Sequence, residues 1–420
     1  MALSRQAEEL AEPEPGHRFF EVLGNFWHPF TNPKGYVNLG IAENSLMHRH
    51  TVDKVNKSFS ISNQNLTYGD SQKQLKDILS AFLNRHLHPC LPIQQEHLNI
   101  VNGCTTALQN LSWALSNPGD IILTGRPFYG GIPMDICRRT GVKLVAIDTE
   151  DYDPLGMQVL SRFEDAILHQ VRVGKRVSAI LLLHPHNPLG RCFDKTVLEA
   201  YMKLCDKYGI HLICNEIYAL STWENKVDTQ KSPKFQSILS INPHGLMSTD
   251  QLHVLWGMSK DFGANGIRLG VTITQNERLR AALQSVYEFS WTSSLADVAT
   301  INLLSDEDWV DWYLTKNRRL LSAAHERVAN WAMTQCIEYE IGSNAGFFLW
   351  VNLGKKYIEN HGAVDDLTAS IMEALLEKKV FLADGIRFGS KRPGWFRIVF
   401  AHDAEYVDEG LNRITQALLN

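Results

Sequence analysis

Short apolar segments alternate with longer amphipathic segments through the middle of the chain. The short segments are rich in branched residues, and several lack polar alternation, which is typical of strands buried on both faces of a mostly parallel sheet. The longer segments carry apolar residues at helical spacing, as in residues 105–115 and 197–208. This order predicts an α/β fold with helices on both faces of a mostly parallel, seven-stranded sheet. The seven predicted strands are residues 98–101, 121–123, 143–147, 177–183, 211–214, 253–255 and 269–274.

The pattern differs after this α/β unit. Residues 309–334 repeat apolar positions at intervals of three and four, which predicts a long amphipathic helix. A strand-like run at 347–351, an Ala/Leu-rich helix near 365–376 and a strand-like run at 395–400 follow. The C-terminal part therefore predicts a smaller α+β unit. Its basic trio Lys316, Arg318 and Arg319 is more typical of a solvated helix face than of a nucleic-acid patch.

Composition and charge narrow the class of partner. The chain of 420 residues is 44% hydrophobic and 21% charged, close to the average for globular proteins. Lys and Arg number 41 against 46 Asp and Glu, so no global basic field draws the chain to nucleic acid or anionic lipid. No apolar run reaches the ~18 residues of a membrane span. We expect no membrane or nucleic-acid partner.

The cysteines and the first residues predict the compartment. Seven cysteines are dispersed without a C-x-x-C pair, which is typical of reduced thiols. Residues 1–17 are polar and acidic, unlike a signal or transit peptide. A cytoplasmic location is therefore predicted. His48-x-His50 has no partnering cysteine or carboxylate in view, so no metal site is predicted.

One glycine-rich motif carries candidate chemistry. It begins with Ser259 and Lys260 at the end of one predicted strand and reaches Arg268 at the start of the next. A lysine beside small residues can form a Schiff base with an aldehyde when its amine is neutral. Arg268 can hold a phosphate by a bidentate contact. The spacing alone is equally compatible with a surface lysine and arginine in a glycine-rich loop.

The motif resembles the cofactor-lysine motif of the class I/II aminotransferases, the fold type I enzymes that use pyridoxal 5'-phosphate. The resemblance implies that Lys260 forms the internal aldimine with the cofactor and that Arg268 binds its phosphate. Five further segments resemble the family's motifs in the same order. They are "NGCTTA" from residue 102, "RPFYGG" from 126, "HPHNPLG" from 184, "NEIYA" from 215 and "GWFRIVF" from 394.

These segments imply roles for further residues. Asn187 and Tyr218 correspond to the residues that contact the cofactor's phenolic oxygen, and Tyr129 to the aromatic ring that stacks on the pyridine. Tyr129 is also placed to hydrogen-bond the reacting substrate. Arg397 corresponds to the clamp on the substrate α-carboxylate. The phosphate turn, between a strand and a helix where free N–H groups bind anions, contributes Cys104, Thr105 and Thr106, with Ser259 beside the lysine.

Within that family the chain is most similar to 1-aminocyclopropane-1-carboxylate synthases and their relatives. "LGIAENSL" places Glu43 at the position of their acidic residue. "LTYGD" places Tyr68 where the family sends a tyrosine into the neighbouring subunit's phosphate site, which implies a homodimer with shared active sites. The resemblance also implies a contiguous cofactor-binding domain, residues 63–304. Residues 1–62 and 305–420 would form a discontinuous small domain, bringing Glu43 and Arg397 to one cleft.

Two positions depart from the family pattern. Gly257 stands where a serine is usual, which removes one hydroxyl from the phosphate site. Asn215 stands where the family has an aspartate that pairs with the protonated pyridine nitrogen. A neutral amide cannot form that charge-assisted bond, so the ring nitrogen should lose its proton more readily.

The sequence supports three functional hypotheses. The first is a lyase resembling 1-aminocyclopropane-1-carboxylate synthase, which cleaves the C–S bond of a sulfur-bearing amino acid by β- or γ-elimination. The second is an aminotransferase, which needs the same lysine and arginine. The third is a fold type I protein whose turnover is weakened by Asn215. In each case Lys260 and Tyr129 are the predicted catalytic residues and a small amino acid is the ligand.

Overall fold

A computed structural model describes residues 3–4, 7–8, 11, 19–68, 72–149 and 152–419. Most of residues 1–17, on which the prediction about a leader rests, lie outside the described residues. Within the described ranges, no helix is long and apolar enough to cross a membrane. All seven cysteines are free thiols.

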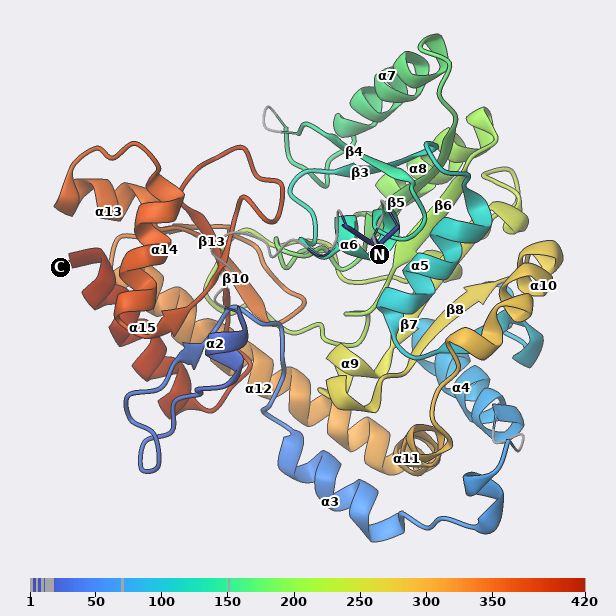
Figure 1. Ribbon diagram of the computed structural model, residues 1–420, viewed down its shortest axis with the longest axis horizontal. Helices are drawn as coiled ribbons and strands as arrows, with labels where there is room; N and C mark the ends of the chain where they lie inside the picture. The colour runs from blue at the N-terminus through green and yellow to red at the C-terminus, as the bar shows by residue number, and fades with distance from the viewer. Residues whose placement is uncertain are drawn as a thin grey trace.

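A seven-stranded mixed sheet forms the centre of the larger part of the molecule (Figure 1). Its strand order is β2-β8-β7-β6-β5-β3-β4, and β8 alone runs antiparallel to its neighbours. Only a short segment joins β7 to β8, and an antiparallel pair, unlike a parallel pair, needs no long crossover. The strands are β2 (Leu98–Val101), β3 (Ile121–Gly125), β4 (Lys143–Ile147), β5 (Val177–Leu183), β6 (His211–Asn215), β7 (Leu252–Gly257) and β8 (Gly270–Thr274).

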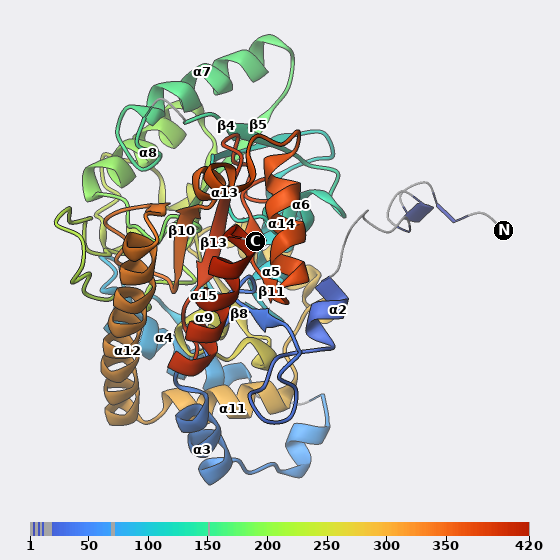
Figure 2. The same cartoon turned by 90° about the vertical axis from the view of Figure 1, so that its left-hand side faces the viewer.

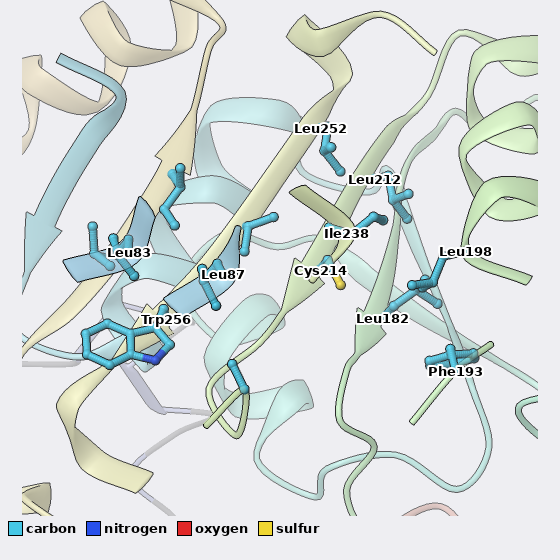
Figure 3. Close-up of a cluster of buried hydrophobic side chains, with 14 of the residues drawn as sticks. Leu83, Leu87, Leu182, Phe193, Leu198, Leu212, Cys214, Ile238, Leu252 and Trp256 are labelled. Carbon is cyan, nitrogen blue, oxygen red and sulfur yellow. The ribbon is translucent and has the colours of Figure 1, made fainter. Parts of the chain in front are cut away.

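Helices cover both faces of this sheet, because alternate strand side chains point to opposite sides. One face packs on α5 (Cys104–Leu115), α6 (Ile132–Cys137) and α10 (Glu277–Ser285) through one buried cluster. The other face packs on a larger cluster, part of which is shown in Figure 3. The helices that contribute to this larger cluster are α4 (Gln72–Leu87), α7 (Val159–Arg172), α8 (Lys195–Tyr208), α9 (Met258–Asp261), α11 (Ser294–Leu304) and α12 (Glu307–Thr334).

A second, smaller unit is built from segments near both chain ends (Figure 2). Its antiparallel sheet has the order β12-β13-β10-β9, and a two-stranded parallel sheet joins β1 to β11. Apolar side chains of these strands pack in one buried cluster with the helices that flank them. The elements are β1 (Val37–Asn38), β9 (Glu338–Tyr339), β10 (Phe348–Asn352), β11 (Val380–Phe381), β12 (Ala383–Asp384), β13 (Trp395–Val399), α13 (Gly354–His361), α14 (Leu367–Glu377) and α15 (Ala404–Leu419).

The remaining described elements are short or lie between these two units. Helix α3 (His48–Ser58) packs against α11. The others are α2 (Phe19–Leu23) and the 3-10 turns η1 (Asn63–Leu66), η2 (Gln95–His97), η3 (Ile238–Ser240), η4 (Thr249–Gln251), η5 (Asn265–Ile267) and η6 (Tyr287–Phe289).

The structure confirms the predicted fold class. All seven expected strands are present in one mostly parallel sheet, with end points that differ by at most two residues. The long helix begins two residues earlier than predicted, at Glu307, because Asp306 caps its first turn by accepting a hydrogen bond from the backbone N–H of Trp309. The division into residues 63–304 and two flanking segments stays a prediction.

Candidate active site

The carboxyl ends of three adjacent parallel strands bring candidate residues to one edge of the sheet. In this register, Asn215 at the end of β6 lies level with Leu183 of β5 and Leu255 of β7. Asn187 follows β5, and Lys260 follows β7 in the single turn of α9. Ligands of open α/β sheets bind outside the carboxyl ends of the strands. The order of the strands therefore assembles residues that are 73 positions apart in the chain.

The Lys260 amine reaches the N-terminal segment of the chain. Its Nζ donates a hydrogen bond to the carbonyl oxygen of Ala42 at 2.6 Å. Burial and the positive charge of Arg397 lower the pKa of Lys260 to about 8, although the charge of Glu43 partly offsets them. About a tenth of the amine is therefore neutral at pH 7, and the neutral amine is the form that attacks an aldehyde.

Glycines bring the first turn of α5 against the start of β8. Gly103, at the N-cap of α5, has φ 117°, a value that disfavours any side chain. A Cβ built on Gly270 would lie 2.4 Å from the carbonyl carbon of Gly103 and 2.5 Å from the backbone nitrogen of Cys104. Free N–H groups at a helix N-terminus bind anions. The close approach therefore fixes the first turn of α5, with its free N–H groups, directly against the start of β8.

Arg268 completes this anion site. Its backbone is left-handed at φ 57°, and its guanidinium lies against Gly103, where a Cβ would come within 2.4 Å of Nη2. Nη1 donates to the carbonyl oxygen of Asn265 at 3.0 Å, and the residue is exposed. A positive charge thus stands directly beside the N-terminus of α5, where both attract the same anion.

The other predicted residues of the turn differ in exposure. Cys104 is buried, and its Sγ donates to the carbonyl oxygen of Trp256 at 3.3 Å. Burial raises the pKa of Cys104 to about 12, so this thiol stays neutral. Thr105 is exposed, and Thr106 is half-buried and donates to Asn102 Oδ1. Ser259 is buried beside Lys260.

Arg397 of β13 is a cation enclosed by the smaller unit. Only 3% of the residue is exposed, and its guanidinium carbon lies 5.1 Å from the ring centre of Phe348 and 4.8 Å from that of Phe388. Nη1 donates to Asn187 Oδ1 at 2.9 Å, and Nη2 donates to the carbonyl oxygen of Gly40 at 2.7 Å. Nε is buried and has no hydrogen-bond partner among the described residues. A buried cation with a spare donor is suited to a carboxylate.

Two tyrosines lie close to this arginine. Tyr218 is buried, with its ring edge-on to Phe347 and Phe348 at centroid distances of 5.3 Å. Tyr129 is half-buried, and burial raises the pKa of its phenol, as it does for Tyr218. Both phenols therefore remain protonated and can donate hydrogen bonds.

Asn215 is 5% exposed, and its side chain has a defined hydrogen bond. Oδ1 accepts from the backbone N–H of Ile217 at 3.2 Å. The backbone carbonyl of Asn215 accepts from the N–H of His184 at 2.9 Å. These contacts fix the amide at the end of β6.

The structure places Glu43 near Lys260, whereas it places Tyr68 on the surface. Glu43 Oε1 accepts from Asn265 Nδ2 at 3.5 Å, and its charge acts on Lys260, so it lies near the predicted site. Tyr68 is 95% exposed, and its ring is tilted by 31° against that of Trp291 at a centroid distance of 5.9 Å. A side chain with that exposure does not line the site of its own chain, and its assignment to a neighbouring subunit stays a prediction.

Two buried carboxyl groups were missed by the sequence analysis. Asp261 accepts hydrogen bonds from Leu220 N–H, Ser221 Oγ and Trp256 Nε1, and burial raises its pKa to about 6. Its place directly after Lys260 was the available signal. Asp135 accepts a hydrogen bond from Thr105, and burial raises its pKa to about 7. No motif indicates Asp135, because only the packing of α6 on α5 brings it there.

Comparison with known proteins identifies the family. The family model described as aminotransferase class I and II matches residues 34–414. The Homo sapiens 1-aminocyclopropane-1-carboxylate synthase-like protein 1 is 30% identical over 422 residues, which cover 96% of this chain and 80% of the human protein. The Mus musculus probable inactive 1-aminocyclopropane-1-carboxylate synthase-like protein 2 is 28% identical, covering 93% of this chain and 67% of the mouse protein.

A solved structure shares the fold. A double mutant of Thermus thermophilus aspartate aminotransferase matches with a TM-score of 0.78 at 20% identity, covering 99% of this chain and 100% of that one. The fold and the site thus define a fold type I enzyme that depends on pyridoxal 5'-phosphate. The chain belongs to the class I and II aminotransferase family, with relatives that resemble 1-aminocyclopropane-1-carboxylate synthase. This confirms the family, the fold and the cofactor predicted from the motifs.

The described residues fit this cofactor. The free N–H groups at the start of α5, held against β8 and beside Arg268, suit a phosphate. Lys260, with its lowered pKa, suits an aldehyde, and the spare Nε of Arg397 suits the carboxylate of an amino acid. These three chemical groups belong to pyridoxal phosphate and an amino-acid substrate together.

Proposed function

We propose that this enzyme is a lyase that cleaves the C–S bond of a sulfur-bearing amino acid by β- or γ-elimination. The observation that carries a pyridoxal-phosphate reaction of an amino acid is the pairing of a lysine of lowered pKa with a buried arginine that keeps a spare donor. The name of the human relative supports the synthase-like type of reaction. The proposal also includes a homodimer, with Tyr68 reaching the neighbouring phosphate site.

Each residue has a separate task in this proposal. Arg397 binds the α-carboxylate, and its bond to Asn187 Oδ1 holds both side chains in place. When bound, pyridoxal phosphate supplies an electron sink for negative charge at the substrate Cα. Lys260, released by the substrate amine, takes the proton from Cα with its neutral amine. Because Arg397 fixes the carboxylate, it also sets which Cα bond faces that base.

The remaining assigned residues hold the cofactor. Arg268, the N–H groups at Cys104–Thr106 and Ser259 bind the phosphate. Asn187 Nδ2 and the Tyr218 hydroxyl would donate to the phenolic oxygen of the bound cofactor, Tyr129 would stack on its ring, and Asn215 would face the ring nitrogen. Asn187 can fill this role because its Oδ1 is already occupied by Arg397, which leaves its Nδ2 as the free group.

Two other functions stay open. The family description supports an aminotransferase, whose half-reaction uses the same lysine and arginine. A weakened or inactive protein is supported by Asn215 and by the name of the mouse relative. Gly257 adds little to that case, because a Cβ there would lie 2.7 Å from the carbonyl oxygen of Leu269 and 3.0 Å from Cys104 Sγ. The local packing therefore has no space for a serine side chain at position 257.

Incubation with candidate amino acids separates these functions. A lyase releases a thiol or thioether from a sulfur-bearing substrate and leaves the cofactor in its aldehyde form. Conversion of the cofactor to its amine form with stoichiometric keto acid, and no released sulfur compound, would instead establish the aminotransferase. Borohydride reduction followed by peptide mapping should label Lys260 in both cases. If neither product forms, Asn215→Asp tests the third function, because restored turnover identifies the amide as the disabling group.

A further inference from the structure

The side-chain amide of Asn215 has only one orientation compatible with its surroundings. The backbone N–H of Ile217 is a donor, and it lies 3.2 Å from the side-chain atom assigned as Oδ1. If the amide oxygen and nitrogen were exchanged, Nδ2 would face the backbone N–H of Ile217, and two donors would meet in a buried place. Oδ1 is therefore committed to the backbone, and the second amide atom, which faces away from Ile217, is Nδ2.

Nδ2 is a donor that has no partner among the described residues. Asn215 as a whole is only 5% exposed, but Nδ2 is not one of the fully buried atoms without a partner, so it stays accessible to a ligand. Asn215 therefore offers a free donor to a ligand, and it cannot accept a hydrogen bond from a ligand through Oδ1 without sharing that oxygen.

We infer that the pyridine nitrogen of the bound cofactor is unprotonated in this enzyme and accepts a hydrogen bond from Asn215 Nδ2. This inference rests on the proposed function, which places Asn215 at the ring nitrogen. An unprotonated pyridine nitrogen has one lone pair and no proton, so it is complementary to a fixed donor. A pyridinium N–H would meet the Nδ2 hydrogens and find no anion, which disfavours the protonated form.

Asp261, Asp135 and Glu43 do not take over the missing charge in this arrangement. Asp261, the acidic residue nearest to Lys260 in sequence, is occupied by three donors, which are Leu220 N–H, Ser221 Oγ and Trp256 Nε1. Asp135 is engaged by Thr105 at the α5 turn, beside the proposed phosphate site. Glu43 lies toward the lysine and Asn265. The ring nitrogen is therefore left to the amide.

The inference narrows the class of substrate. A neutral ring withdraws electrons less strongly than a pyridinium, so it holds negative charge from Cα less well. A substrate with a leaving group on Cβ relieves this limit, because the electron pair of the broken Cα–H bond forms the Cα–Cβ double bond while the sulfur leaves with the C–S electrons. The proton goes to Lys260 and can return to the departing thiolate. The amide thus favours β-elimination over a reaction that stores charge on the ring.

Nitrogen NMR of the bound cofactor tests the inference directly. The full-length enzyme is loaded with pyridoxal phosphate labelled with 15N at the ring, and the resonance is compared with free-base and pyridinium references. We expect a free-base resonance in the native enzyme and a shift to the pyridinium position in Asn215→Asp. The aspartate keeps the bond to Ile217 with one oxygen and offers a charged acceptor with the other.

Asn242→Asp is the matched control. Asn242 Oδ1 accepts from the backbone N–H of His244 at 3.1 Å, the same local geometry as at Asn215, but this residue is exposed. The control should keep the free-base resonance. A pyridinium resonance in the native enzyme, or a free-base resonance in Asn215→Asp, would overturn the inference while Lys260 is still labelled by borohydride. Failure to label Lys260 would overturn the proposed site, and this inference with it.

Discussion

The contact between β8 and the first turn of α5 can be tested with a single methyl group. In Gly270→Ala, the new Cβ would meet the carbonyl carbon of Gly103 at 2.4 Å and the nitrogen of Cys104 at 2.5 Å. Ordinary contacts to a Cβ begin near 3.4 Å, so the gap is short by about 1 Å. Both neighbours are backbone atoms, which cannot rotate away. Helix α5 and strand β8 must therefore separate by a distance of that order.

The expected cost has two parts. Overpacking of this kind destabilises a protein by about 1–3 kcal/mol, which urea unfolding of the cofactor-free enzyme measures. Displacing the N–H groups at Cys104 also weakens the proposed phosphate site. Loss of one hydrogen bond to a charged group is worth about 1.5–3 kcal/mol, which corresponds to a rise in the apparent Kd for pyridoxal phosphate of roughly 10- to 100-fold. Titration of the cofactor-free protein, followed by cofactor absorbance, measures this change.

Gly266→Ala provides the control within the same motif. No heavy atom lies within 4 Å of a Cβ at Gly266, and its φ is not in the left-handed region. This variant should stay within about 1 kcal/mol of the native free energy of unfolding, with unchanged cofactor affinity. If Gly270→Ala equals Gly266→Ala in both measurements, the close approach of α5 and β8 does not build the phosphate site.

Two further predictions concern the lysine and the partner subunit. Because the pKa of Lys260 is lowered to about 8 and only the neutral amine attacks an aldehyde, the rate of cofactor uptake should rise about tenfold per pH unit below 8 and level off above it. Stopped-flow absorbance measures this profile, and a rate that is flat between pH 6 and about 8 would contradict it. Mixing the Tyr68→Phe variant with the Lys260→Ala variant should restore activity. In a hybrid dimer, one of the two sites combines an intact Lys260 from one subunit with an intact Tyr68 from the other. Random pairing predicts about a quarter of native activity, measured after refolding the mixture, whereas no recovery would show that Tyr68 does not act across subunits.

Much of the site follows from local sequence because motif residues sit where strands end. The apolar runs at β5, β6 and β7 place Asn187, Asn215 and Lys260 at one edge of the sheet once the strands are parallel. The local sequence is sufficient to predict these positions, because the direction of a strand decides which of its ends lies at the candidate site.

Other features depend on contacts between distant segments. The bond between Arg397 and Asn187 joins positions 210 residues apart, and that between Lys260 and Ala42 joins positions 218 apart. Asp135 enters the site only because α6 packs on α5. No local pattern encodes such pairs, since each depends on how two separately folded layers meet.

The sequence by itself therefore determined the alternating strands and helices, the lysine motif and the substitution of asparagine at position 215. The structure showed the orientation of that asparagine, with Oδ1 accepting from the backbone N–H of Ile217, which a one-dimensional pattern does not display. The tertiary structure also lowered the pKa of Lys260 and left the buried Nε–H of Arg397 without a partner among the described residues, since burial and neighbouring charge exist only after folding.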